Sequence, residues 1–193
     1  MKIGVLALQG AFAEHEKVLE QLGAECIELR QARNLSEPYD ALVLPGGEST
    51  VQGKLLKELG MFDIMKSQIE NGMPVLATCA GAILLAETID GQMKGQPDQY
   101  FGTIPMRIRR NAYGRQLGSF HTEAQVAGIG TVPMTFIRAP YIASVGNGVE
   151  VLAVVEERIV GVKYKNQMAF SFHPELDPDM RIHKTFLSMI SNV

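Results

Sequence analysis

The first half of the chain alternates short apolar runs with helical or polar segments, and this alternation most constrains the fold. The runs at 3–8, 25–29, 41–44 and 74–78 have the length and composition of buried strands. The helical pattern after the first run ends at Gly23, a residue favoured just past a helix end. Strands separated by helices predict a parallel sheet that is covered on both faces.

The second half of the chain has a different pattern, in which short β segments follow one another. They are expected near 103–110, 117–126 and 134–138, as a hairpin of 149–155 with 158–164, and at 167–172 before a helix near 179–191. The stretch 87–102 has the weakest pattern. We therefore expect an α/β fold of three layers, a mostly parallel central sheet flanked by helices with an antiparallel β extension, in one domain over 1–193.

Composition and charge exclude several classes of protein. Of the 193 residues 46% are hydrophobic and 20% charged, as in ordinary globular proteins, and a net charge of −3 without a basic block does not favour nucleic acid. No run of 18 apolar residues and no signal-peptide layout is present. Cys26 lies in an alternating strand and is expected to be a small core residue, in a reduced, cytoplasmic setting. No cluster has metal-ligand spacing, so we expect no metal and no other cofactor.

Cys79 stands where an apolar run ends and small residues begin. Ala77 and Gly81, two positions to either side, are small enough for a strand to turn sharply into a helix. The first N–H groups of that helix would favour a thiolate and could bind an oxyanion. A buried core cysteine is the alternative, and this segment by itself leaves both interpretations open.

A second motif supplies a base for that cysteine. A free thiol with a pKa of about 8.5 is only a few per cent thiolate at pH 7, and a nearby imidazolium favours the anion. His173 follows an apolar run, so it is expected at a strand end, and in extended chain Glu175 points to the same side. Pro174 stiffens the link. A surface His and Glu in a turn is the alternative, but with Cys79 they make a nucleophile, a base and an orienting carboxylate.

The segment Pro45-Gly46-Gly47-Glu48-Ser49 ends another predicted strand. In an open α/β sheet the carboxyl ends of parallel strands share one rim, so this segment is expected near Cys79. Gly46 and Gly47 let backbone N–H groups approach a ligand closely, and Ser49-Thr50 can cap the next helix. A plain turn with a helix cap is the alternative. A Walker loop is excluded because its Lys-Ser/Thr pair is absent.

Six motifs, in order along nearly the whole chain, together resemble one family. They are Leu8-Gln9-Gly10-Ala11, Pro45-Gly46-Gly47-Glu48-Ser49-Thr50, Thr78-Cys79-Ala80-Gly81, Arg110-Asn111-Ala112-Tyr113-Gly114-Arg115-Gln116, Phe136-Ile137-Arg138-Ala139-Pro140 and Ser171-Phe172-His173-Pro174-Glu175-Leu176. The chain resembles the glutaminase subunits of pyridoxal 5′-phosphate synthase, which are triad (class I) glutamine amidotransferases with a flavodoxin-like fold.

The resemblance implies a mechanism for glutamine hydrolysis. Cys79 would attack the side-chain amide and form a γ-glutamyl thioester. His173 would protonate the departing ammonia and then activate water, while Glu175 holds His173. The backbone N–H groups of Gly47 and Ala80 would form the oxyanion hole.

The resemblance also implies a glutamine-binding set, which consists of Gly47, Glu48, Ser49, Arg110, Ile137 and Arg138. A guanidinium such as that of Arg110 can bind the α-carboxylate through two parallel hydrogen bonds. For Arg107 and Arg109 we expect only a solvated strand face. A structural ion pair is the alternative for Arg138.

A chain of this size leaves no room for a second domain that would consume ammonia. The resemblance names a partner, a (β/α)8-barrel synthase subunit that makes pyridoxal 5′-phosphate (vitamin B6) in a large hetero-oligomer. Gln9, Gly10 and Ala11 end the first strand on the rim of the site and are candidates for that interface. A glutaminase of another pathway and a non-catalytic relative are the two alternatives.

Some positions depart from the family pattern or have no part in the motifs. Ala77 replaces a usual glycine, Val51 a usual threonine, and His121 a frequently acidic residue; the segment 91–102 also differs. His15, between two glutamates, and His183, in the last helix, are expected at the surface.

Overall fold

The computed structural model describes residues 1–91, 99–110 and 119–190. The strands in these ranges form one twelve-stranded sheet, whose parallel part has the order β2-β1-β3-β4-β12. These strands are β1 (Lys2–Leu6), β2 (Glu25–Leu29), β3 (Ala41–Leu44), β4 (Val75–Thr78) and β12 (Gln167–Phe170). A short 3-10 helix, η1 (Ala32–Ser36), follows β2. The predicted parallel sheet is confirmed.

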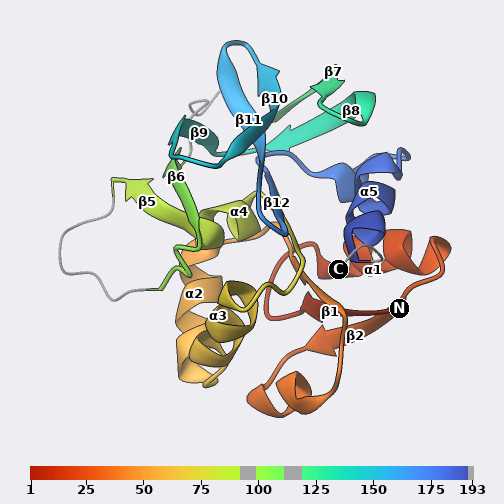
Figure 1. Cartoon of the computed structure of the whole chain (residues 1–193), viewed down its shortest axis with the longest axis vertical. Coiled ribbons are helices and arrows are strands. Elements are labelled where there is room, and N and C mark those ends of the chain that lie inside the picture. Colours follow the sequence, from red (N-terminus) through yellow and green to blue (C-terminus); the bar gives the residue numbers. More distant parts are fainter. Residues whose placement is uncertain (92–98, 111–118, 191–193) are drawn as a thin grey trace.

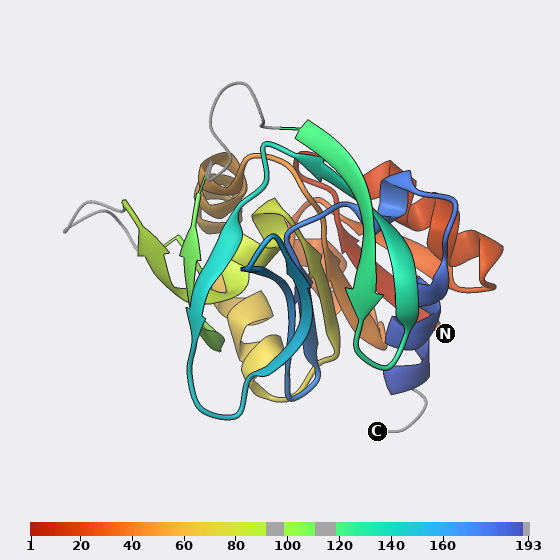
Figure 2. The same cartoon turned by 90° about the horizontal axis from the view of Figure 1, so that it is seen from above.

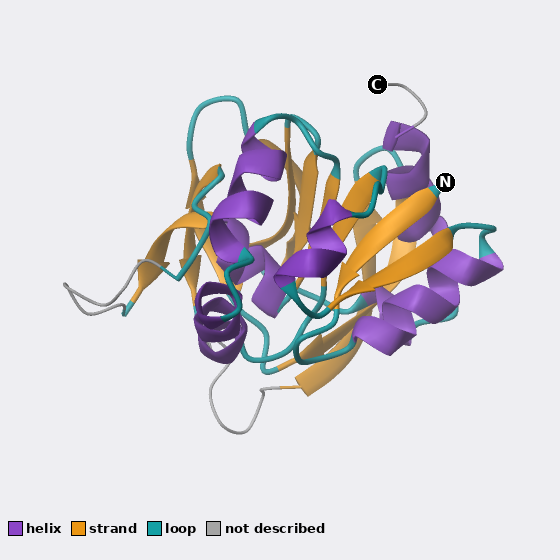
Figure 3. Cartoon of the chain, turned by 90° about the horizontal axis from the view of Figure 1, so that it is seen from below, coloured by secondary structure: helices purple, strands orange, loops and turns teal. Residues whose placement is uncertain are grey.

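Helices cover both faces of this sheet (Figures 1 and 3). They are α1 (Phe12–Gln21) and α5 (Arg181–Ile190) on one face, and α2 (Ser49–Glu58) and α3 (Phe62–Glu70) on the other. Successive strand residues face opposite sides. Val5 accordingly packs in a core with Leu19 of α1, whereas Leu6 packs in a second core with Leu56 of α2. The molecule therefore has the three layers expected from its sequence.

The antiparallel extension continues the sheet beyond β12 (Figure 2). Its strands are β11 (Arg158–Tyr164), β10 (Glu150–Val155), β7 (Ser119–Val126) and β8 (Gly130–Ile137). β9 (Tyr141–Val145) also pairs with β11, and β6 (Ile104–Arg109) pairs with β9. The predicted hairpin of β10 with β11 is confirmed. β8 begins earlier than expected because it pairs with β7 along its full length.

Two local predictions are wrong. The helix after Cys79, α4 (Ala80–Leu85), is followed at once by β5 (Ala86–Asp90), which pairs in parallel with β6, although no strand was expected there. All six α4 residues are buried, so neighbouring strands rather than helix propensity decide where it stops. The cap of α2 also differs: the Glu48 carboxylate accepts the Thr50 N–H at 3.4 Å, and Ser49 is the first helical residue.

The expectation that His15 and His183 lie at the surface is wrong as well. Neither side chain has solvent exposure, because α1 and α5 turn them toward the sheet. The ring nitrogens His15 Nδ1 and His183 Nε2 are 2.9 Å apart. In the ranges that the structure describes, no helix is long and apolar enough to span a bilayer.

Candidate active site

Cys79 occupies a sharp turn between β4 and α4. Its φ of 46° and ψ of −101° form a conformation that costs a residue with a side chain free energy. A Cβ atom at Gly81 would overlap the carbonyl of Leu44, so α4 passes β3 so closely that this position requires a small residue. The Cys79 N–H donates to the Phe170 carbonyl of β12 at 2.8 Å, which ties the turn to the neighbouring strand.

β12 brings the base to this turn. It pairs in parallel with β4, with Phe170 opposite Thr78, so the chain that leaves β12 passes beside Cys79. The His173 N–H donates to the Thr135 carbonyl of β8 at 2.8 Å. A 3-10 helix, η2 (Pro174–Leu176), starts at once, so a helical turn and not extended chain sets Glu175 beside His173.

The structure brings Cys79, His173 and Glu175 together. His173 Nδ1 and Glu175 Oε1 are 2.6 Å apart, and each residue is 6% exposed, which excludes a surface His–Glu pair. Burial alone would lower the pKa of His173, but hydrogen bonds to Cys79 and Glu175 raise this pKa to about 10. Because Nδ1 is engaged with Glu175, Nε2 is the nitrogen left for the sulfur. The geometry favours an imidazolium beside the thiol group.

The other cysteine is in a different environment. Burial, helped by Glu16 and Glu20, raises the pKa of Cys26 to about 12, so this thiol stays protonated. Both cysteines are free. Cys26 was expected to be a small core residue, and it is partly buried against the core on the α1 face.

A cavity of about 290 Å³ opens at Cys79 and His173. This volume lies at the lower end for ligand pockets and suits a small molecule. Its lining consists of Gln9, Gly10, Ala11, Gly46, Gly47, Glu48, Cys79, Ile137, Arg138 and His173. Four of the expected glutamine-binding residues and the three expected interface residues thus meet at one place.

The remaining expected residues lie next to this cavity without lining it. Ser49 is buried at the start of α2, and Ala80 is the first residue of α4. The Arg110 guanidinium donates to Thr50 Oγ1 at 2.9 Å and to Glu48 Oε1 at 3.3 Å, so it lies over the rim.

Other arginines fit their expected surroundings to different degrees. Arg107 and Arg109 are exposed and pair with Asp90, as a solvated strand face predicts. Arg138 has a φ of 44° and lines the cavity. None of the ion pairs within the described ranges includes it, so the structural alternative is not seen there. The motif residues 111–116, including Arg115, lie outside the described residues.

The Gly46-Gly47 segment is fixed from two sides. The Gly46 N–H donates to Thr78 Oγ1 at 3.1 Å, and the Gly46 carbonyl accepts the Ala11 N–H at 3.0 Å. Gln9 Oε1 accepts the Glu48 N–H at 2.7 Å. A Cβ atom at Gly46 would overlap the imidazole ring of His173, so this position has room only for glycine.

Comparison with known proteins agrees with this geometry. The model of the SNO glutamine amidotransferase family matches residues 5–192. This chain belongs to the SNO glutamine amidotransferase family.

Similar proteins include "Pyridoxal 5′-phosphate synthase subunit PdxT" of Desulfitobacterium hafniense, which is 60% identical over 192 residues, 100% of this chain and 94% of the relative. The PdxT subunit of Streptococcus pneumoniae is 53% identical over 98% of this chain and 97% of its own length. A solved structure described as a glutamine amidotransferase is 43% identical, with a TM-score of 0.91 over 98% of each chain.

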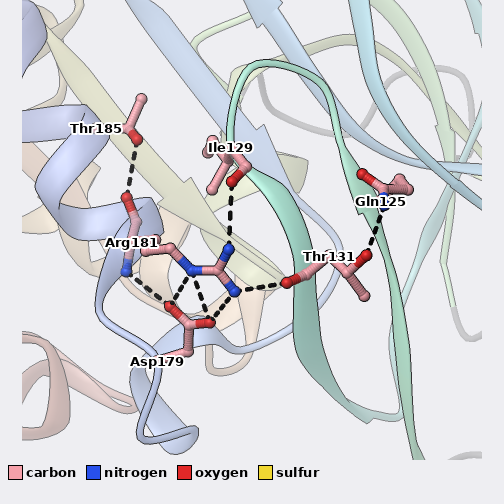
Figure 4. Close-up of polar contacts among 6 residues, drawn as sticks. All are labelled: Gln125, Ile129, Thr131, Asp179, Arg181 and Thr185. Atoms are coloured by element: carbon pink, nitrogen blue, oxygen red, sulfur yellow. Dashed lines mark hydrogen bonds and ion pairs between the residues drawn. The ribbon is translucent and has the colours of Figure 1, made fainter.

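The β7–β8 hairpin of this amidotransferase is tied to the segment after Glu175. The Arg181 guanidinium donates to the carbonyls of Ile129 and Thr131 in the hairpin and to the Asp179 carboxylate (Figure 4). Thr135 of β8 donates its hydroxyl to Asp177 Oδ1 at 3.1 Å. The hairpin therefore holds both ends of the segment that contains His173 and Glu175.

Sequence reasoning missed several residues that contact the site of this amidotransferase, namely Thr78, Thr135, His15 and His183. For His15 a signal was available, because Val18 and Leu19 lie on the same helix face at spacings of three and four residues. For Thr135 there was none, since the pairing of β8 with the loop after β12 is long-range. Among the described residues, no group of three or more His, Cys, Asp or Glu side chains could hold a metal ion.

Proposed function

We propose that this chain is the glutaminase subunit of a pyridoxal 5′-phosphate synthase and hydrolyses L-glutamine to L-glutamate and ammonia. The observation that carries the proposal is the buried contact of Cys79, His173 and Glu175 at one cavity. Family membership and 53–60% identity to PdxT subunits support the same pathway, and they argue against a glutaminase of another pathway. The assembled triad argues against a non-catalytic relative.

The three side chains have complementary roles in this proposal. The Cys79 sulfur attacks the amide carbon of glutamine, and His173 gives its proton to the leaving ammonia. His173 then takes a proton from water, whose oxygen attacks the γ-glutamyl thioester and releases glutamate. Glu175 holds the Nδ1–H of His173 at 2.6 Å, so the ring keeps one orientation through both steps.

We assign the oxyanion hole to the backbone N–H groups of Gly47 and Ala80. Ala80 begins α4 directly after the nucleophile, where helix N–H groups lack an intrahelical partner. Gly47 lines the cavity beside Cys79.

Glutamine recognition is assigned to the cavity wall and its rim. Arg110 does not line the cavity, but it donates a hydrogen bond to Glu48, which does. Its guanidinium fits an α-carboxylate. Gly47, Glu48, Ile137 and Arg138 line the space for the rest of the substrate, and Ser49 supports this wall from the start of α2.

A separate subunit must receive the ammonia, because free ammonia is protonated and lost in water. We propose a (β/α)8-barrel synthase in a large hetero-oligomer as this partner, with Gln9, Gly10 and Ala11 at the contact. Gln9 supports this assignment because its side chain bonds the Glu48 N–H beside the cavity. Gln9→Ala should weaken activation by the synthase, and unchanged activation would refute the contact. The two free thiols support a reducing, cytoplasmic location.

Glutamate release tests the proposed function directly. The purified chain is assayed with glutamine, with and without its synthase subunit. Wild type with synthase should release glutamate, and Cys79→Ala should release none. Absence of glutamate from the wild-type complex would refute the proposal.

A further inference from the structure

A buried histidine contacts the triad at the Glu175 oxygen that does not bond His173. His15, on α1, has no solvent exposure, and its Nε2 is 3.0 Å from Thr78 Oγ1 and 3.4 Å from Glu175 Oε2. On its other side Nδ1 is 2.9 Å from His183 Nε2 of α5. Four segments distant in sequence thus meet at one imidazole ring.

Glu175 needs a partner for its second oxygen. Oε1 bonds His173, whereas Oε2 is buried and makes no hydrogen bond to the described residues. A buried carboxylate oxygen without compensation costs free energy. A contact of 3.4 Å to His15 Nε2 is a polar contact that the structure gives this oxygen.

The hydrogen-bond pattern assigns the protons of both rings. With its proton on Nε2, His15 presents an N–H to Thr78 and Glu175, and its Nδ1 accepts the Nε2–H of His183. The opposite arrangement would turn a lone pair toward the carboxylate. It would also leave the buried His183 Nδ1 with a proton and no acceptor, because this atom has no partner among the described residues.

Both rings act as neutral dipoles. Burial lowers the pKa of His15, and burial together with His15 lowers the pKa of His183 to about 3. The titratable groups around His15 are Glu175, His173, His183 and Glu14. Since His15 stays neutral, the positive charge of this cluster remains on His173.

We propose that His15 is a positioning residue of the triad, which holds Glu175 Oε2 so that Oε1 stays on His173, with His183 fixing the His15 tautomer. Thr78 connects His15 with the segment of the proposed oxyanion hole, since its Oγ1 also accepts the N–H of Gly46, the residue before Gly47. His15 does not line the cavity, so its effect is on the chemical step and not on substrate contact. The inference rests on the proposed function for the reaction that it assists.

Three substitutions at position 15 test the role, each in the complex with the synthase. His15→Ala should lower kcat about 10- to 100-fold, as loss of an outer support does, with little change in KM for glutamine. His15→Gln should recover most of kcat because its amide N–H reaches the position of Nε2. His15→Asn should not recover it, because its amide nitrogen reaches only the position of Nδ1 and faces His183.

Alkylation of Cys79 by iodoacetamide, followed against pH, adds a readout that needs no glutamine. The alkylation rate of Cys79 changes at high pH where His173 loses its proton, and this change is the upper limb of the profile. When Glu175 is released, His173 loses its proton more easily, so this upper limb should move to lower pH in His15→Ala. It should stay in place in His15→Gln. A merely structural role would not shift this limb.

The outcomes separate the two proposals. Wild-type kcat and an unshifted profile in His15→Ala, or equal losses in the Gln and Asn variants, would overturn the positioning role. If His15→Ala does not fold, the contrast between Gln and Asn decides. If wild type releases no glutamate, the proposed function fails, and the alkylation profile still judges His15.

Discussion

Cys79 combines two demands in one residue, because it carries the thiol and also occupies a strained backbone turn. A positive φ is costly for any residue with a Cβ atom and costs glycine little. The strain persists because the close pass of α4 against β3 and the bond to Phe170 leave the turn no alternative. The chemistry at this position is therefore obtained at a cost in stability.

Glycine at position 79 should make the protein more stable than alanine there. Both substitutions remove the sulfur, so the comparison isolates the backbone. We expect Cys79→Gly to exceed Cys79→Ala by about 1 kcal/mol in free energy of unfolding, which reverses the usual order of these two residues. Urea denaturation measures the difference. An alanine variant as stable as the glycine variant or more so would show that the turn is not strained.

At the scale of the element, the β7–β8 hairpin supports the site from outside the parallel sheet. Its strand β8 accepts the His173 N–H and ends at Ile137, in the cavity wall. Arg181 anchors the same hairpin to the start of α5. The antiparallel extension therefore places the base and part of the binding wall at once.

Removing the hydroxyl of Thr135 should loosen this support. Thr135→Val removes the hydroxyl that donates to Asp177 Oδ1, so this oxygen keeps the 3.6 Å contact to the exposed His121 side chain, next to an Oδ2 that already has no hydrogen bond among the described residues. We expect a loss of about 2 kcal/mol in free energy of unfolding. Thr135→Ser keeps the hydroxyl and is the matched control. Equal stability of the valine and serine variants in urea would contradict the role of this bond.

At the scale of the whole molecule, the fold buries neutral histidines in the layer between α1, α5 and the sheet. His183 has a pKa of about 3 in the folded state because burial opposes its charge. An unfolded chain binds a proton at this side chain below about pH 6.5. Between these values the unfolded state holds one proton more, so stability rises with pH.

Acid should therefore weaken the fold before the carboxylates titrate. From pH 6.5 down to about 4.5, His183 alone should remove about 1 kcal/mol of unfolding free energy per pH unit. His183→Gln keeps a donor for His15 but does not titrate, so its stability should depend less on pH. Urea titrations at several pH values test this. If the unfolding free energy falls with decreasing pH at the same slope in the wild type and in His183→Gln, His183 is excluded as the cause.

Sequence patterns predicted the parts of the molecule that depend on local order. The spacing of the apolar runs and the glycine that ends the first helix located the strands of the parallel sheet. The small residues at 77 and 81 indicated the turn at Cys79. Where long-range pairing decides, the patterns failed: β5 lies mostly in the stretch 87–102, whose pattern is the weakest, and it forms because β6 lies beside it. His15 looked exposed between two glutamates, because its partner His183 is 168 positions away.

The position of β12 has a consequence for the synthesis of the protein. This strand lies between β4 and β11, yet the ribosome makes it long after β4. Until it inserts, the thiol of Cys79 has no imidazole beside it, and the middle of the sheet has a gap that only this strand fills. Such distant pairings form slowly. A nascent chain therefore gains the imidazole for its thiol only when β12 closes the sheet.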